Sequence, residues 1–245
     1  EHDSVLQTKV RTTLVNVDVD GCIDLGHLAT CLAAVPDGKR AQTLLSVMMA
    51  NNETGVIQPV DEVAAMAHSA GIALHSDMVQ MLGKAQVDFA SSGLDYASVS
   101  AHKIGGPTGI GAVLVRPGNR LTSLLRGGGQ EQGRRSGTEN VVGIAGFGAA
   151  ARAAFDDVGL YRQMAEWRNN FETQMCSLRD DVTIFGNRAN RIGNTSCIAV
   201  GEKPSEVMVM ALDIAGIAVS AGAACSSGKV HESHVLKAMQ AGTGA

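Results

Sequence analysis

Residues 43–55, TLLSVMMANNETG, decide the fold: an apolar run is followed directly by a polar segment. The run from Thr43 to Ala50 holds no charged residue and is short for a helix. It is typical of a strand buried on both faces, as in parallel sheets. The polar segment, which includes Asn52, therefore falls at the carboxyl end of a predicted strand.

The same alternation continues on either side of this stretch. Residues 59–70 predict a helix with Pro59 in its first turn and Gly71 just past its end. Upstream, a strand is expected over 11–19 and a helix over 24–35. Downstream, three more strands are expected. One covers 72–75 and leads to Asp77, the next covers 96–100 and leads to His102 and Lys103, and the last covers 109–115. Strands that alternate with helices predict an α/β fold with a mostly parallel sheet.

Two long helices follow, over 140–157 and 160–178. The second carries a stripe of large apolar residues, which we interpret as core: Tyr161, Met164, Trp167, Phe171 and Met175. We expect a large domain over 1–157 and a smaller α+β C-terminal domain over 158–245.

Composition excludes several classes of protein. The net charge is −4 and aromatic residues make up 3%, so a nucleic-acid partner is not expected. No apolar run approaches the roughly 20 residues of a membrane span, and no signal peptide is expected. The five cysteines are scattered without a CxxC pair, which argues against a disulfide framework or a zinc site and favours a cytoplasmic setting.

Polar side chains at the ends of the predicted strands are candidate binding or catalytic residues, because α/β sheets of this kind bind ligands beyond the carboxyl ends of their strands. Lys103 is either a surface charge or a desolvated Schiff-base nucleophile. Asp77 is either a helix cap or a carboxylate partner for a pyridinium nitrogen. Gln80 reaches the same site if a helical turn starts there, and Asn52 is either a turn residue or a donor to the cofactor.

Two glycine-rich segments are further candidates. Residues 127–138, GGGQEQGRRSGT, are either a flexible surface loop or an anion-binding loop. Residues 220–229, SAGAACSSGK, set Cys225 among small residues, between an expected strand (IAVS) and helix (SHVLKAM), where a thiolate can act. For Cys22, Cys31, Cys176 and Cys197 we expect core packing.

Five segments together resemble the cysteine desulfurases of the nitrogen-fixation and iron–sulfur assembly type, within the class V aminotransferase group of pyridoxal-phosphate (PLP) enzymes. The resemblance runs over nearly all of the chain. It is carried by MMANNETG (48–55), HSDMVQMLGK (75–84), SVSAHKIGGPTGIGAVLVR (98–116), GGGQEQGRRSGTENV (127–141) and SAGAACSSGK (220–229).

The resemblance implies fold type I of the PLP-dependent transferases and a role for each matching residue. Lys103 would bind the cofactor covalently, and Asp77 would hold its pyridine nitrogen. Asn52 and Gln80 would contact its phenolic oxygen, and Ser100 its phosphate. The remaining implied site residues are His102 at the cofactor and in proton transfer, His2 stacked on the ring, Thr138 at the phosphate of a second subunit, and Cys225 as the persulfide-forming thiol.

The implied activity is removal of sulfur from L-cysteine, giving L-alanine and a persulfide on Cys225. The implied partners are a second copy of the chain and an iron–sulfur scaffold or other sulfur acceptor. No resident metal is expected; the one metal role implied for Cys225 is as ligand of a cluster shared transiently with the scaffold. Two alternatives stay open: another class V PLP enzyme such as a selenocysteine lyase, and an inactive fragment that only dimerises or docks an acceptor.

Departures from the family pattern concern the ends and two positions. Relatives carry a preceding segment with a phosphate-binding Gly-Thr turn, and continue past Ala245 to an arginine that clamps the substrate carboxylate. We therefore expect this chain to be truncated at both ends. Gln132 stands where relatives often have arginine, and Ala101 where many have glycine.

Overall fold

The computed structural model describes residues 1–8, 10–222 and 233–241. They divide into two compact units, which are described separately. Unit 1 comprises 1–35, 48–59 and 160–245, and unit 2 comprises 36–47 and 60–159. The change of unit near residue 160 falls close to the predicted domain boundary, whereas 1–35 and 48–59 group with the C-terminal residues. The predicted division at 157/158 stays a prediction.

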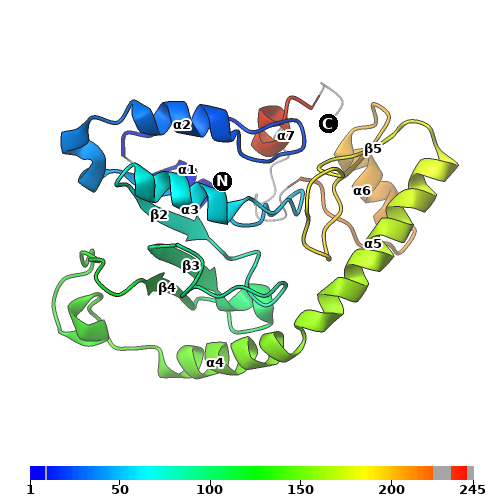
Figure 1. The fold of residues 1–245 in the computed structure, drawn as a ribbon. Coiled ribbons are helices and arrows are strands. Elements are labelled where there is room, and N and C mark those ends of the chain that lie inside the picture. Colours follow the sequence, from blue (N-terminus) through cyan, green and yellow to red (C-terminus); the bar gives the residue numbers. More distant parts are fainter. Residues whose placement is uncertain (9, 223–232, 242–245) are drawn as a thin grey trace. The chain divides into compact units, whose positions relative to one another are not determined.

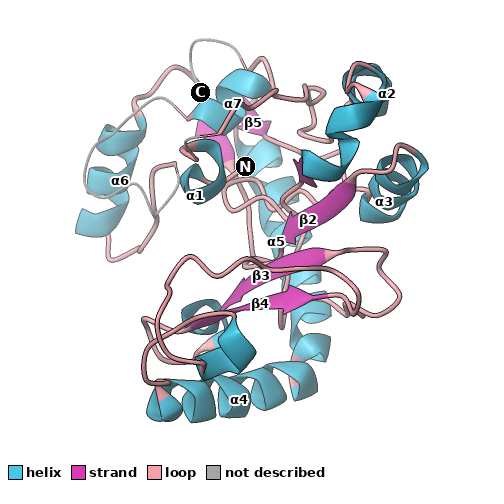
Figure 2. Ribbon diagram, turned by 90° about the vertical axis from the view of Figure 1, so that its left-hand side faces the viewer, coloured by secondary structure: helices cyan, strands magenta, loops and turns pink. Residues whose placement is uncertain are grey.

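Unit 2 is built on one four-stranded sheet of order β1-β2-β3-β4 (Figures 1 and 2). Strands β1, β2 and β3 are parallel, and β4 pairs antiparallel with β3. The mostly parallel sheet agrees with the predicted fold class. Its strands are β1 (Leu44–Ser46), β2 (Ala73–Asp77), β3 (Tyr96–Ser100) and β4 (Gly111–Val115).

Helices and short 3-10 turns complete unit 2. They are η1 (Asp37–Gln42), α3 (Val60–Ser69), η2 (Ala101–Ile104), η3 (Gln130–Gly133) and α4 (Val141–Asp156). Gly71 takes a positive φ of 67° just after α3, as predicted for a C′ glycine. Helix α3 packs on β2, and its buried face holds Val60, Val63, Ala64 and Ala67.

Unit 1 holds the remaining elements. They are α1 (Asp3–Leu6), α2 (Leu25–Ala33), α5 (Val158–Leu178, which begins at the unit boundary), β5 (Val182–Ile184), β6 (Ile198–Val200), α6 (Ser205–Ile214) and α7 (His234–Ala238). Strands β5 and β6 form an antiparallel pair. A small core joins α7 to the chain around this pair, with Val235, Leu236 and Met239 packed against Val17, Phe185 and Cys197.

Several sequence-based expectations need correction. Residues 11–19 form no strand in the described structure beyond an isolated bridge from Val17 to Ile23, because β-branched residues need a partner strand to pair with. Residues 217–220 are likewise not a strand. Strand β1 is shorter than predicted, and Leu44 is exposed rather than buried on both faces.

The apolar stripe of α5 is also less buried than predicted. Trp167 and Phe171 of the stripe are 60% and 49% exposed. The side chain that α5 buries is instead that of Glu172, which is not part of the stripe. Cys176 is exposed, contrary to the expected core packing, whereas Cys197 lies against the α7 core. None of the helices in the described ranges is long and apolar enough to cross a membrane.

Candidate active site

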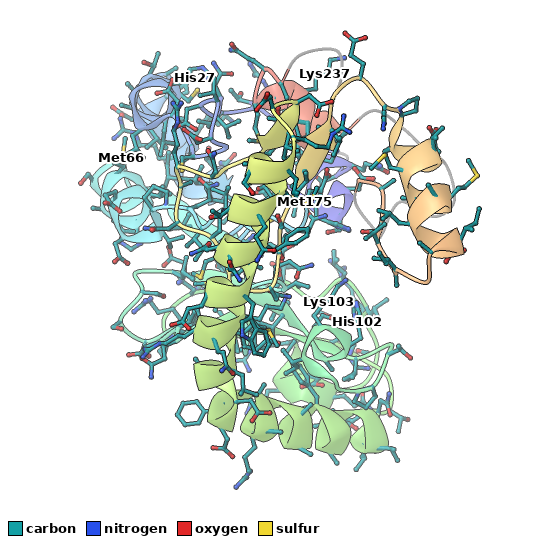
Figure 3. The ribbon with its side chains drawn as sticks, turned by 90° about the vertical axis from the view of Figure 1, so that its right-hand side faces the viewer. His27, Met66, His102, Lys103, Met175 and Lys237 are labelled. Atoms are coloured by element: carbon teal, nitrogen blue, oxygen red, sulfur yellow. The ribbon has the colours of Figure 1, made fainter. Side chains whose placement is uncertain are left out.

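The predicted cofactor residues of unit 2 come from the carboxyl ends of two neighbouring parallel strands. Asp77 is the last residue of β2, and Ser98, its register partner on β3, leads within a few residues to Lys103. His102 and Lys103 follow one another on η2, directly after β3 (Figure 3). The sheet therefore brings the predicted carboxylate and the predicted amine to one edge.

Asp77 is buried, at 5% exposure, and its carboxylate is held by the local backbone. Its Oδ1 accepts the N–H of Val79 at 2.9 Å. The N–H of Met78 is bonded to the carbonyl of Ser98, so the chain leaves β2 still attached to β3. A buried carboxylate with one oxygen engaged has its second oxygen available to accept from a ligand N–H.

The helical turn that Gln80 requires is present. The N–H groups of Met81 and Leu82 donate to the carbonyl of Met78 at 2.9 and 3.0 Å, and that of Lys84 donates to Met81. Gln80 thus stands one turn beyond Asp77, as the sequence spacing predicts. Its side-chain Oε1 accepts from Lys84 Nζ.

The turn that carries Lys103 is fixed by its glycines. Gly105 ends η2 with a left-handed φ of 79°, and the N–H of Gly106 donates to Ala101. A Cβ at Gly106 would lie 3.0 Å from the Ala101 Cβ, so the side chain of Ala101 fits because residue 106 has none. The close approach of the two residues therefore depends on a glycine at position 106.

Ser100 and His102 are brought together, with 2.7 Å between Ser100 Oγ and His102 Nδ1. His102 is exposed and Ser100 is half-buried. A hydroxyl and an imidazole beside an amine supply hydrogen-bond donors suited to an anionic group such as a phosphate.

A polar row, which sequence reasoning missed, lies on the face of the sheet that carries Asp77. His75 bridges two strands: Nδ1 lies 2.8 Å from Ser46 Oγ, and Nε2 lies 3.2 Å from Ser98 Oγ. Burial lowers the pKa of His75, and the nearby carboxylate of Asp77 partly opposes that shift. The signal in the sequence was the two-residue spacing of His75 and Asp77, which places both on one face of a strand.

Lys84 was also missed as a candidate. Its side chain is 8% exposed, and burial, followed by the positive charge of Lys103, lowers its pKa to about 8. The four-residue spacing from Gln80, one helical turn, was the available signal.

Residues 127–138 form an internally bonded loop. Arg135 donates to the carbonyls of Ser136 and Gly137 and pairs with Glu131 at 3.2 Å. Glu131 and Gln132 take positive φ angles of 51° and 57°, a conformation that is uncommon for residues other than glycine. Thr138 is exposed in the same unit. The guanidinium of Arg135 is thus engaged by the loop itself.

Two predicted residues belong to unit 1. His2 accepts the N–H of Ser4 on Nδ1 and so caps the short helix α1. In the NNETG segment it is Asn51 that makes the turn, with Oδ1 accepting the N–H groups of Glu53 and Thr54 at 2.9 Å. Asn52 itself lies in this turn, while the side-chain hydrogen bonds that hold it come from its neighbour. Cys225 lies outside the described residues.

The side chains of unit 2 fit PLP in their chemistry. Asp77 offers a buried carboxylate for a pyridinium nitrogen, Lys103 an amine for the aldehyde carbon, Gln80 an amide for the phenolic oxygen, and Ser100 and His102 donors for the phosphate. In the ranges that the structure describes, no group of three or more His, Cys, Asp or Glu side chains could hold a metal ion.

Fold and site together define an α/β protein of fold type I, with the predicted lysine and carboxylate at neighbouring strand ends. The chain belongs to the aminotransferase class-V family, which residues 3–243 match. The predicted family and fold class are thereby confirmed.

Its relatives are cysteine desulfurases. The chain is 39% identical to a cysteine desulfurase of Cereibacter sphaeroides over 98% of its own length and 62% of that protein. It is 38% identical to the cysteine desulfurase NifS of Azotobacter vinelandii over 91% of the chain and 54% of the relative. The chain therefore spans roughly half to two thirds of these proteins.

Solved structures give the same family. A NifS-like protein from Rickettsia africae is 31% identical and superposes with a TM-score of 0.87, covering 99% of this chain and 64% of that one. SspA in complex with cysteine is 26% identical, with a TM-score of 0.75, over 98% of this chain and 67% of that one.

Proposed function

We propose that the chain is the larger part of a PLP-dependent cysteine desulfurase. The observation that carries the proposal is the placement of Asp77 and Lys103 at the ends of adjacent parallel strands, in a chain about 39% identical to cysteine desulfurases. PLP is the cofactor of this family, and when bound it supplies an electron sink for the substrate carbon.

The residues of unit 2 would divide the work of binding and proton transfer. Asp77 would keep a proton on the ring nitrogen of the cofactor, and Lys103 would hold the cofactor and move the proton of the substrate carbon. His102, bonded to Ser100, is the second candidate for proton transfer. Gln80 and Ser100 are the further proposed cofactor contacts of unit 2. For Asn52 and His2, which belong to unit 1, a cofactor contact is proposed from the family resemblance alone.

The sulfur-transfer step is assigned to Cys225 by the resemblance of 220–229 to the family. Its thiolate attacks the sulfur of L-cysteine, so a new S–S bond forms while the C–S bond of the substrate breaks. The electron pair left on carbon takes up a proton, giving L-alanine and a persulfide on Cys225. A persulfide is passed on by exchange, so an iron–sulfur scaffold or other acceptor is the proposed partner.

A homodimer is part of the proposal. Support comes from the resemblance at Thr138, which in the family reaches the cofactor phosphate of the other subunit. Thr138 is exposed in unit 2, as such a role requires.

The test uses the purified 245-residue chain with PLP and L-cysteine, measuring alanine, sulfide and protein persulfide. We expect Lys103→Ala to lose both the yellow lysine-bound chromophore and turnover. Cys225→Ala should keep the chromophore and lose the persulfide, while Cys176→Ala, at an exposed cysteine, serves as the matched control.

Each contrary result has a distinct meaning. Undiminished turnover in Cys225→Ala would overturn the thiol assignment and favour another class V activity, which is checked with selenocysteine. A wild-type chain with no chromophore would overturn the enzyme proposal and favour a fragment that only dimerises or docks an acceptor.

A further inference from the structure

Lys84 is a buried lysine with a specific partner in the proposed cofactor site. Its side chain is 8% exposed, and its Nζ donates to Oε1 of Gln80 at 2.5 Å. Lysine is seldom buried unless it is paired. The contact therefore calls for an explanation beyond a solvated surface charge.

The turn that carries Lys84 is packed too tightly to move freely. Gly83, with a φ of 73°, lies so close to η2 and α4 that a Cβ there would be 2.7 Å from Ala154 Cβ and 3.0 Å from Ile104 Cγ2. The N–H of Lys84 is bonded to the carbonyl of Met81 at 3.0 Å. Packing thus fixes the backbone from which the Lys84 side chain extends, and the bond to Gln80 Oε1 fixes its ammonium.

The direction of this hydrogen bond matters for Gln80. A glutamine amide has an acceptor end and a donor end, whereas a lysine ammonium can only donate. Because Lys84 takes the Oε1 end, the Nε2 hydrogens remain as the donor end of the amide. An anionic phenolic oxygen accepts and cannot donate, so it needs that end.

The charge on Lys84 persists at neutral pH. Burial and the neighbouring charge of Lys103 lower the pKa of Lys84 to about 8, so most molecules keep the ammonium near pH 7. The positive charge of Lys103, the proposed cofactor-binding amine, is the second cause of this shift.

We propose that Lys84 is a positioning residue that orients the amide of Gln80, presenting its Nε2 to the phenolic oxygen of PLP. The inference rests on the proposed function and deepens it, because Lys84 acts through Gln80 and not on the substrate. It adds a second lysine to the site, with a structural and electrostatic task distinct from that of Lys103.

The test is a double-mutant cycle on PLP binding by the full chain. The variants are Lys84→Met, Gln80→Ala and the pair together, with the PLP dissociation constant and the chromophore's absorbance maximum as readouts. We expect Lys84→Met to weaken binding on the order of tenfold, as for a lost hydrogen bond to a charged group, and to shift the absorbance maximum. In the Gln80→Ala background the same change should alter the constant by less than about twofold.

Two further variants separate positioning from folding. Lys84→Arg keeps the donor and should restore much of the binding. Lys39→Met removes a matched but exposed lysine–glutamine pair, Lys39 Nζ to Gln42 Oε1 at 3.4 Å, and should leave both readouts unchanged. A thermal melt of each variant checks that the fold survives.

A second readout does not need the cofactor. In the cofactor-free chain labelled with ¹⁵N-glutamine, Lys84→Met should move the Gln80 side-chain amide signal towards that of a mobile glutamine. An unchanged Gln80 signal, or an equal loss of PLP binding with and without Gln80, would overturn the inference. If the double-mutant cycle gives the expected PLP-binding constants but the chain makes no alanine, only the desulfurase proposal is overturned. A chain that binds no PLP would overturn both the desulfurase proposal and the role of Lys84.

Discussion

The carboxylate of Asp77 accepts the backbone N–H of Val79 on Oδ1 at 2.9 Å. This bond needs an oxygen but not a charge, so asparagine can replace it. We therefore expect Asp77→Asn to keep the turn and the thermal midpoint of the wild-type chain. Desulfuration should fall roughly 100-fold or more, because the negative charge that would hold the ring nitrogen protonated is gone.

The measurement for Asp77→Asn pairs alanine production with thermal unfolding. Loss of both together would mean that Asp77 is chiefly structural. Unchanged turnover would contradict its assignment to the pyridine nitrogen.

His75 joins β1 to β3 through hydrogen bonds to Ser46 and Ser98. Burial lowers its pKa below the ordinary value of 6.5, so the unfolded chain binds a proton at His75 more readily than the folded chain. Stability should therefore decrease as pH falls below about 6.5. In His75→Gln, which cannot take up that proton, the free energy of unfolding should fall less steeply over this range.

Denaturant unfolding of the wild type and His75→Gln at pH 7.5, 6.5 and 5.5 checks this expectation. Two parallel curves would show that His75 takes up a proton equally readily in the folded and the unfolded chain, and would contradict a pKa lowered by burial.

Glu172 and Arg191 form a buried ion pair in unit 1. Each carboxylate oxygen of Glu172 accepts from one Nη of Arg191 at 2.7 Å, and Ser196 Oγ adds a bond at 2.6 Å. Breaking one side of such a pair leaves a buried charge without its partner. We expect Glu172→Gln to lower the free energy of unfolding by about 3 kcal/mol near pH 7.

The pH dependence of Glu172 has a definite sign. Burial raises the pKa of Glu172, but the bonds from Arg191 and Ser196 outweigh it and lower the pKa below the ordinary 4.5. The ionised side chain therefore stabilises the fold above pH 4.5, and this stabilisation is lost as the pH falls through the folded pKa. The difference in the free energy of unfolding between the wild type and Glu172→Gln should therefore become smaller below pH 4.5. Asp181→Asn breaks the exposed pair with Arg179 and serves as the control, with no change expected in the unfolding midpoint.

Gly83 combines a positive φ with close packing against Ala154 and Ile104. Gly83→Ala should destabilise the chain by roughly 2 to 4 kcal/mol, the sum of backbone strain and overpacking. Gly71→Ala, at a φ of 67° with nothing within 4 Å of the added Cβ, should show the backbone cost alone. Equal losses in the two variants would contradict a packing role for Gly83.

The sequence by itself determined the order of elements around the site. The apolar runs and caps that predicted α2, α3, β2 and β3 are local signals, and the structure confirms these elements within a few residues. Polar residues at strand ends followed from the same alternation, so the sequence alone places Asp77, Ser100, His102 and Lys103 at one edge of the sheet, and the parallel pairing of β2 and β3 agrees. Family motifs added the chemistry.

Only the tertiary structure decided which of these segments pair as strands and which side chains are buried. Residues 11–19 have strand propensity but form only the bridge from Val17 to Ile23 among the described residues, and β4 pairs antiparallel although its sequence gives no direction. Gly83, next to the buried Lys84, packs closely against Ile104 and Ala154, and Ala154 lies 71 positions further along the chain. Propensity acts over a few residues, whereas pairing and burial depend on contacts between distant ones, and a single sequence does not encode those contacts in its local pattern.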